Sequence, residues 1–104
     1  MTYTADQLAL KAHIDSENAE RQAWMDAAPR RWAGMVVSDP EHWAGYDIYT
    51  VEGYKHYMAA CDNFEIKREI YGYKPSWNYD SMTLAEIEAD TQCILDAERE
   101  ADEQ

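Results

Sequence analysis

The sequence predicts an all-α fold, a compact bundle of three principal helices near residues 5–27, 50–71 and 84–101, with an irregular Trp-rich connector between the first two. Capping-box patterns precede the first and last helices, and Pro29 and Gly72 follow the first two as stop signals. No stretch alternates between apolar and polar residues over the length of a strand. With 104 residues, the chain is expected to form a single domain.

The first helix begins after a capping box, because Thr4 is followed three residues later by Gln7. Its apolar residues share one side at helical spacing: Leu10, Ile14 and Met25. In the connector, Asp39 and Pro40 form an N-cap followed by proline at the first helical position, which predicts a short helical turn through Trp43. Arg30 and Arg31 are adjacent bases, but one dipeptide does not make a nucleic-acid-binding patch.

The second helix is predicted from Thr50 to Tyr71, with Gly72 as its left-handed C-terminal cap. Five residues share an arc of about 120° on this helix: Tyr54, Tyr57, Met58, Cys61 and Phe64. Ile66 and Ile70 face the opposite side. Either Asp62-Asn63 marks a kink, or the last turns are buried on another face.

The third helix has the clearest start signal, because Thr83 and Glu86 form a capping box. Its apolar stripe consists of Leu84, Ile87, Thr91, Ile94 and Leu95. Beyond this stripe the same arc carries Glu98 and Asp102, so the helix has nothing further to bury. Residues 98–104 are therefore expected to fray.

The charge of the chain is strongly acidic and unevenly distributed. Twenty-one acids against nine bases give a net charge of −12, and residues 80–104 carry nine of the acids and a single base, Arg99. Affinity for phosphates comes from Lys and Arg that release condensed counterions. This balance opposes direct binding to nucleic acid or to an anionic membrane surface, so the expected partner is either a basic protein or none.

No constellation of residues predicts an enzyme, a cofactor or a metal site. The three histidines, His13, His42 and His56, lack metal-ligand spacing. Cys61 and Cys93 are too few for a disulfide framework, and both are expected to be reduced, buried thiols. No apolar run approaches the roughly 20 residues that span a bilayer, so a cytoplasmic location is expected.

The acids of the last helix form the first candidate binding surface. Six of them are expected to face a partner: Glu86, Glu88, Asp90, Asp96, Glu100 and Glu103. An ordinary exposed helix intersperses bases at i, i+4 spacing for mutual support, and this one has only Arg99. The alternative is that these acids are simply the solvated face of a structural helix.

A loop with an unusual aromatic content, residues 72–81, forms the second candidate. Tyr73, Trp77 and Tyr79 lie in it, and loop aromatics supply large, rigid contact areas at protein interfaces. The competing interpretation is a loop that folds back as a lid over a small core. The sequence leaves these two interpretations open.

In composition, and in the segment "LAEIEADTQCILDAEREADE", the chain resembles the small acidic inhibitors encoded by phages and mobile elements, notably anti-CRISPR proteins and other nucleic-acid mimics. The resemblance implies a stoichiometric inhibitor whose acidic helix mimics a phosphate backbone. It also implies a partner with a basic nucleic-acid groove, for example a CRISPR surveillance complex in the host cytoplasm. The alternative is a helical adaptor or subunit of a phage or bacterial assembly, and the oligomeric state stays open.

Overall fold

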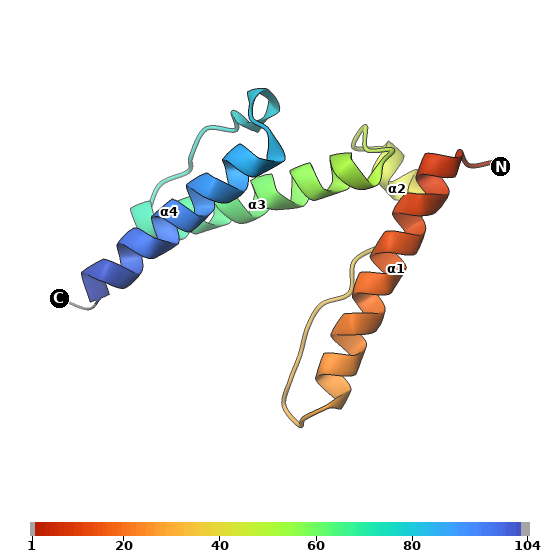
Figure 1. Ribbon diagram of the computed structural model, residues 1–104, viewed down its shortest axis with the longest axis horizontal. Coiled ribbons are helices and arrows are strands. Elements are labelled where there is room, and N and C mark those ends of the chain that lie inside the picture. The colour runs from red at the N-terminus through yellow and green to blue at the C-terminus, as the bar shows by residue number, and fades with distance from the viewer. Residues whose placement is uncertain (1, 103–104) are drawn as a thin grey trace. The chain divides into compact units, whose positions relative to one another are not determined.

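The computed structural model describes residues 2–102, and within that range it contains four α-helices and no strand (Figure 1). The helices are α1 (Ala5–Asp26), α2 (Pro40–Ala44), α3 (Val51–Tyr71) and α4 (Leu84–Asp102), with a 3-10 turn, η1 (Tyr79–Ser81), before α4. The all-α class and the three principal helices are confirmed. The helical backbone of α4 continues to Asp102, and the last two residues of the segment expected to fray lie outside the described range.

Hydrogen bonds at the predicted caps explain why the helices begin and end where the sequence predicts. At α1, Thr4 Oγ1 accepts the Gln7 N–H at 3.1 Å, and Gln7 Oε1 accepts the Thr4 N–H at 2.9 Å. Thr83 and Glu86 make the same reciprocal pair at the start of α4. Gly72 ends α3 with φ of +75°, a left-handed conformation that glycine adopts without strain.

The chain divides into two compact units, unit 1 up to Tyr54 and unit 2 from Lys55 onward. In unit 1, α1 packs against α2, and the connector runs back beside α1 (Figure 1). The buried apolar side chains of this unit are Leu10, Ile14, Pro40, Trp43, Ile48 and Tyr54. The edge of the Trp43 ring meets the Tyr54 ring, with 5.1 Å between the centroids.

Polar side chains hold the irregular connector against α1. The Asn18 amide donates to the Val36 carbonyl at 2.8 Å and accepts the Val36 N–H at 3.0 Å, so it satisfies both backbone groups of that residue. The Trp43 indole N–H donates to the Val37 carbonyl. The connector can therefore remain extended without a partner strand, because side chains take the place of a strand ladder.

In unit 2, α4 lies alongside α3 (Figure 1). The core of this unit consists of Ala60, Tyr79 and Ile87, with Ala59, Phe64 and Met82 packed against it. Ile87 is the one apolar residue of α4 that is fully buried within the described range, and Leu95, at the end of the predicted stripe, is 43% exposed. Apolar burial on α4 is therefore small.

A buried amide, that of Asn63 on α3, joins the three parts of unit 2. Its oxygen accepts the Tyr79 hydroxyl at 2.7 Å, and its nitrogen donates to Asp90 and to Thr91 at 2.9 Å each. Lys67 adds an ion pair to Asp90 at 3.1 Å. The Asp62-Asn63 pair does not break α3, which is helical throughout, and Asn63 instead fixes the loop and α4 to it.

The cysteines differ from each other, and the expectation of two buried thiols is wrong for Cys93. Cys61 is half-buried on α3, whereas Cys93 is exposed on α4. Cys93 follows Ile87 by six residues, which turns its side chain about 120° away from the core at 100° per residue. The position of Cys93 around the helix therefore accounts for its exposure.

Replacing Asn63 by Ala is expected to lower the free energy of unfolding by roughly 2–4 kcal/mol, because the buried Tyr79 hydroxyl then loses its acceptor. Urea titration monitored by circular dichroism measures this change. Asn78→Ala is the matched control, since Asn78 is exposed and makes no side-chain cap hydrogen bond, and its effect is expected within about 0.5 kcal/mol. Equal losses for the two variants would contradict the role given to Asn63.

Asp90 is expected to contribute to stability in a pH-dependent way. The hydrogen bond from Asn63 and the neighbouring Lys67 lower the pKa of Asp90 in the folded chain. Its contribution is therefore complete above the unfolded-state pKa of about 3.9, and it is lost as the pH falls through the lower folded-state value. Asp90→Asn keeps the shape of the side chain without titrating in this range. The stability difference between wild type and Asp90→Asn is expected to be constant above pH ~5 and to shrink toward pH ~3, and a constant difference down to pH ~3 would contradict it.

Cys93 is expected to react with a maleimide well before Cys61. Burial raises the pKa of Cys61, which reduces its thiolate population at neutral pH, and Cys93 is open to solvent. Mass spectrometry of peptides after timed labelling measures the two rates separately. Cys93→Ser should remove the fast phase and Cys61→Ser the slow one; indistinguishable rates at the two positions would argue against this assignment.

Candidate functional site

The acids predicted to form one face of α4 fall into two groups in the structure. Glu86 and Asp90 make hydrogen bonds that shape unit 2, whereas Glu88, Asp96 and Glu100 are on the outer part of the helix. The sixth residue, Glu103, lies outside the described range. The predicted surface is therefore smaller than the sequence indicated.

Glu86 acts as a cap. Its carboxylate accepts the Thr83 N–H at 3.1 Å, and this backbone hydrogen bond lowers the pKa of Glu86. The side chain remains exposed and charged at the N-terminus of α4, where a negative charge is favourable. It can still attract a basic partner, but it has a structural role as well.

Asp90 was expected on the outer face, and the structure places it against α3. Its carboxylate is held by the Asn63 amide and by Lys67 Nζ, and its side chain is 39% exposed. The reason is its position 60° from Ile87 around the helix, at the edge of the buried side. Asp90 is therefore part of the unit 2 core network, and its charge is already compensated.

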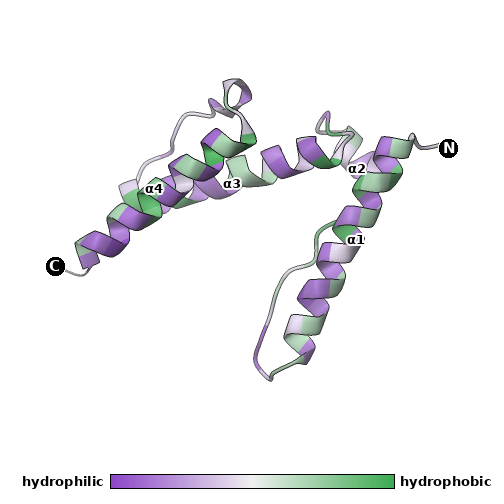
Figure 2. Cartoon of the chain, in the orientation of Figure 1, coloured by the Kyte–Doolittle hydropathy of each residue, from purple (hydrophilic) through white to green (hydrophobic). Residues whose placement is uncertain are grey.

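The remaining acids lie on the side of α4 that faces away from the core. At 100° per residue, Glu88, Asp96 and Glu100 span an arc of about 120°. Asp96 accepts hydrogen bonds from Gln92 and Arg99, and within the described range no ion pair involves Glu88 or Glu100. Figure 2 shows that hydrophilic and hydrophobic positions are interleaved along α4, so the acids do not cover a continuous face.

Small residues lie between these acids. A shallow hollow, called here the α4 hollow, is lined by Ala89, Gln92, Cys93, Asp96, Ala97 and Glu100. Ala89, Cys93 and Ala97 recur at i, i+4 spacing and form its apolar floor, so the backbone of α4 is open to close approach. This spacing is visible in the sequence, but the acids on the same helix are the stronger signal there.

The aromatic loop combines the two interpretations that the sequence left open. Tyr79 is 1% exposed and bonded to Asn63, so it is a core residue and has no surface to offer a partner. Trp77 is 47% exposed, and one side of its ring packs on Tyr57, Phe64 and Tyr79. The loop is therefore a lid at Tyr79 and partly surface at Trp77.

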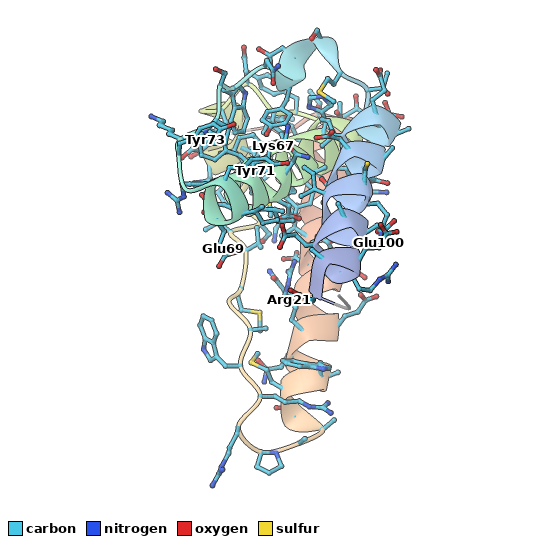
Figure 3. All side chains as sticks on the ribbon, turned by 90° about the vertical axis from the view of Figure 1, so that its left-hand side faces the viewer. Arg21, Lys67, Glu69, Tyr71, Tyr73 and Glu100 are labelled. Carbon is cyan, nitrogen blue, oxygen red and sulfur yellow. The ribbon has the colours of Figure 1, made fainter. Side chains whose placement is uncertain are left out.

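Tyr73 is the most exposed of the predicted loop aromatics. It is 64% exposed and stacks on Tyr71, with 6.0 Å between the ring centroids and 18° between their planes. Figure 3 shows the two rings next to each other where α3 ends. This stacked pair presents flat apolar area to solvent, as an interface aromatic would.

A further surface, which the sequence did not indicate, lies in unit 1 where α1 passes into the connector. Trp32 is 80% exposed, and Trp24 and Met35 are each about half exposed. The Arg31 guanidinium lies over the Trp24 ring, 5.1 Å from its centroid, and donates to the Trp24 carbonyl at 3.1 Å. Tryptophan, methionine and arginine are among the residue types enriched in protein interfaces.

The arrangement of these groups is suited to binding by charge and apolar contact. Exposed carboxylates on α4 can pair with Lys or Arg, and the aromatic residues can desolvate a contact. Among residues 2–102, no group of three or more His, Cys, Asp or Glu side chains is placed to hold a metal ion. No helix in that range is long and apolar enough to cross a membrane.

No family model matches the chain, and comparisons with curated proteins and with solved structures find no match either. The likeness to anti-CRISPR proteins therefore rests on the composition of the chain and on its acidic C-terminal segment. A proposal about function must therefore be argued from the chemistry of the exposed surfaces.

Proposed function

We propose that the chain is a stoichiometric inhibitor that binds a basic nucleic-acid-binding protein through the exposed carboxylates of α4. One observation carries the proposal: most acids of α4 have no compensating base. Within the described range, the acids of α4 without an ion pair are Glu86, Glu88, Glu98, Glu100 and Asp102. The single base on the helix, Arg99, is paired with Asp96.

This charge pattern costs stability. Glu98 and Asp102 carry like charges at i, i+4 spacing, as do Asp96 and Glu100, and such pairs destabilise a helix by a few tenths of a kcal/mol each. The fold obtains no hydrogen bond or ion pair from Glu88 or Glu100 within residues 2–102. These acids lower the stability of the fold and have no structural role in it, which favours a role in binding a partner.

The density of charge fits a mimic of a duplex edge. The 19 residues of α4 span about 28 Å, and B-DNA of that length carries about 17 phosphate charges on both strands. A protein that grips one side of a duplex meets fewer than half of these phosphates. The five acids of α4 without an ion pair are of the same order, which favours a partner with a nucleic-acid groove, for example a CRISPR surveillance complex.

A second candidate function is a helical adaptor or assembly subunit that binds through apolar anchors. The exposed, stacked Tyr71 and Tyr73 and the half-exposed Trp77 favour it. The two candidates differ in what the acids do. An adaptor should tolerate neutralisation of α4 and depend on the aromatic surface, whereas a mimic should compete with nucleic acid for its target.

Replacing Glu88 and Glu100 by Lys is expected to slow association with the partner at least ~10-fold at low salt and to abolish competition with DNA or RNA, because exposed charges act mainly through electrostatic steering. Affinity of the wild type should fall as salt shortens the Debye length from ~10 Å at 0.1 M to ~3 Å at 1 M. The partner is first recovered by pull-down from the native host, and rates are then measured by surface plasmon resonance.

Glu52→Lys combined with Glu69→Lys provides the matched control, because it changes the net charge equally at exposed positions outside α4. Its association rate is expected to change much less. Tyr73→Ala tests the adaptor, since it removes exposed aromatic area and leaves the Tyr79 core intact. If the α4 variant binds as fast as wild type and Tyr73→Ala raises the dissociation rate, the adaptor is correct and the mimic is wrong.

A further inference from the structure

The surface at the α1–connector junction has a chemistry unlike the rest of the chain. Residues 29–37 contain two bases and no acid, in a chain with a net charge of −12. We call this surface the Arg–Trp turn and define it by Trp24, Arg30, Arg31, Trp32 and Met35. Its apolar side chains are exposed to solvent, Trp32 by 80%, and Trp24 and Met35 by about half.

Arg30 has no role that the fold explains. Its φ of +68° lies in the left-handed region, where glycine or asparagine is the usual residue. Within the described range its side chain makes no hydrogen bond or ion pair, in contrast to Arg31, which is held on Trp24. Arg30 therefore has a backbone conformation that is unfavourable for arginine, and its guanidinium is available to bind an acid on another molecule.

The α4 hollow offers the complementary chemistry. Its floor of Ala89, Cys93 and Ala97 is apolar and low, so it can accept a flat ring. Its rim carries Glu100, which has no ion pair in the described range, and Asp96. These two features complement the Arg–Trp turn: the carboxylate can pair with a guanidinium, and the apolar floor can contact the neighbouring indole.

We propose that the Arg–Trp turn of one copy docks on the α4 hollow of a second copy, with Trp32 over the small residues and Arg30 paired with Glu100. The contact joins two different surfaces, so it is heterologous and repeats from copy to copy into a ring or an open chain. This inference goes beyond the proposed function, because it requires no partner other than the chain itself.

Charge decides the conditions under which this contact forms. Each copy is strongly acidic, so the copies repel one another at low salt. At about 0.15 M salt the Debye length is about 8 Å, which screens distant acids while leaving pairs in direct contact largely unscreened. The two surfaces are small, so the association is weak, with a dissociation constant expected on the order of 10–1000 µM.

Sedimentation velocity at about 0.15 M salt, from ~10 µM to ~1 mM protein, tests the proposal without any partner. The mean mass of wild type should rise with concentration. Arg30→Glu and Glu100→Lys should each weaken association at least ~10-fold, and the double variant should regain it, because the ion pair between copies is then restored with its two charges exchanged. Lys55→Glu is the control, an exposed base outside both surfaces, and should associate as wild type does.

Cys93 supplies an independent measurement, because it lies on the floor of the α4 hollow. Its maleimide reactivity should fall as wild-type concentration rises, and it should stay constant in Trp32→Ala. A single-chain mass up to ~1 mM, or a double variant that does not regain association, would overturn the proposal. Cys93 protection that is independent of concentration would overturn it too, since it would place the contact within one chain.

Discussion

Unit 2 depends on the hydrogen bonds of one buried side chain, the Asn63 amide. From its place on α3, it binds the loop through Tyr79 and α4 through Asp90 and Thr91. Apolar packing alone would place α4 loosely, because Ile87 is its one fully buried residue within the described range. The hydrogen bonds of the amide are directional and limited in number. They therefore set both the position of α4 along α3 and the side of α4 that faces outward.

This constraint decides which acids of α4 can take part in binding. Once Asp90 is bound to Asn63 and Lys67, the helix can present Glu88, Asp96 and Glu100 on the opposite side. In this orientation of α4, the small residues Ala89 and Cys93 also face outward. The surface that results is acidic at its edges and low in its middle, so a partner can approach the helix backbone closely while it pairs with the acids.

The helix boundaries could be predicted because the signals that set them are local. Each cap joins residues three apart, and Gly72 acts through its own φ angle. The roles of Asn63 and Tyr79 could not be predicted in this way, because their hydrogen bond joins residues 16 apart and shows no pattern in either segment. For the sequence, a kink at Asp62-Asn63 was one of two open alternatives, whereas in the structure Asn63 binds the neighbouring elements. Trp32 was equally ambiguous, because an aromatic residue in an irregular connector can be buried or exposed.

The two proposed contacts compete, since both use the carboxylate of Glu100. An α4 hollow occupied by the Arg–Trp turn of another copy has fewer free acids for a basic protein. Weak association between copies falls on dilution, whereas tight binding to a scarce target persists, so the target prevails at low concentration. Self-association at high concentration would also cover exposed indoles that otherwise favour aggregation. The strained backbone at Arg30 then has an explanation, because the charge it presents is useful only outside its own chain.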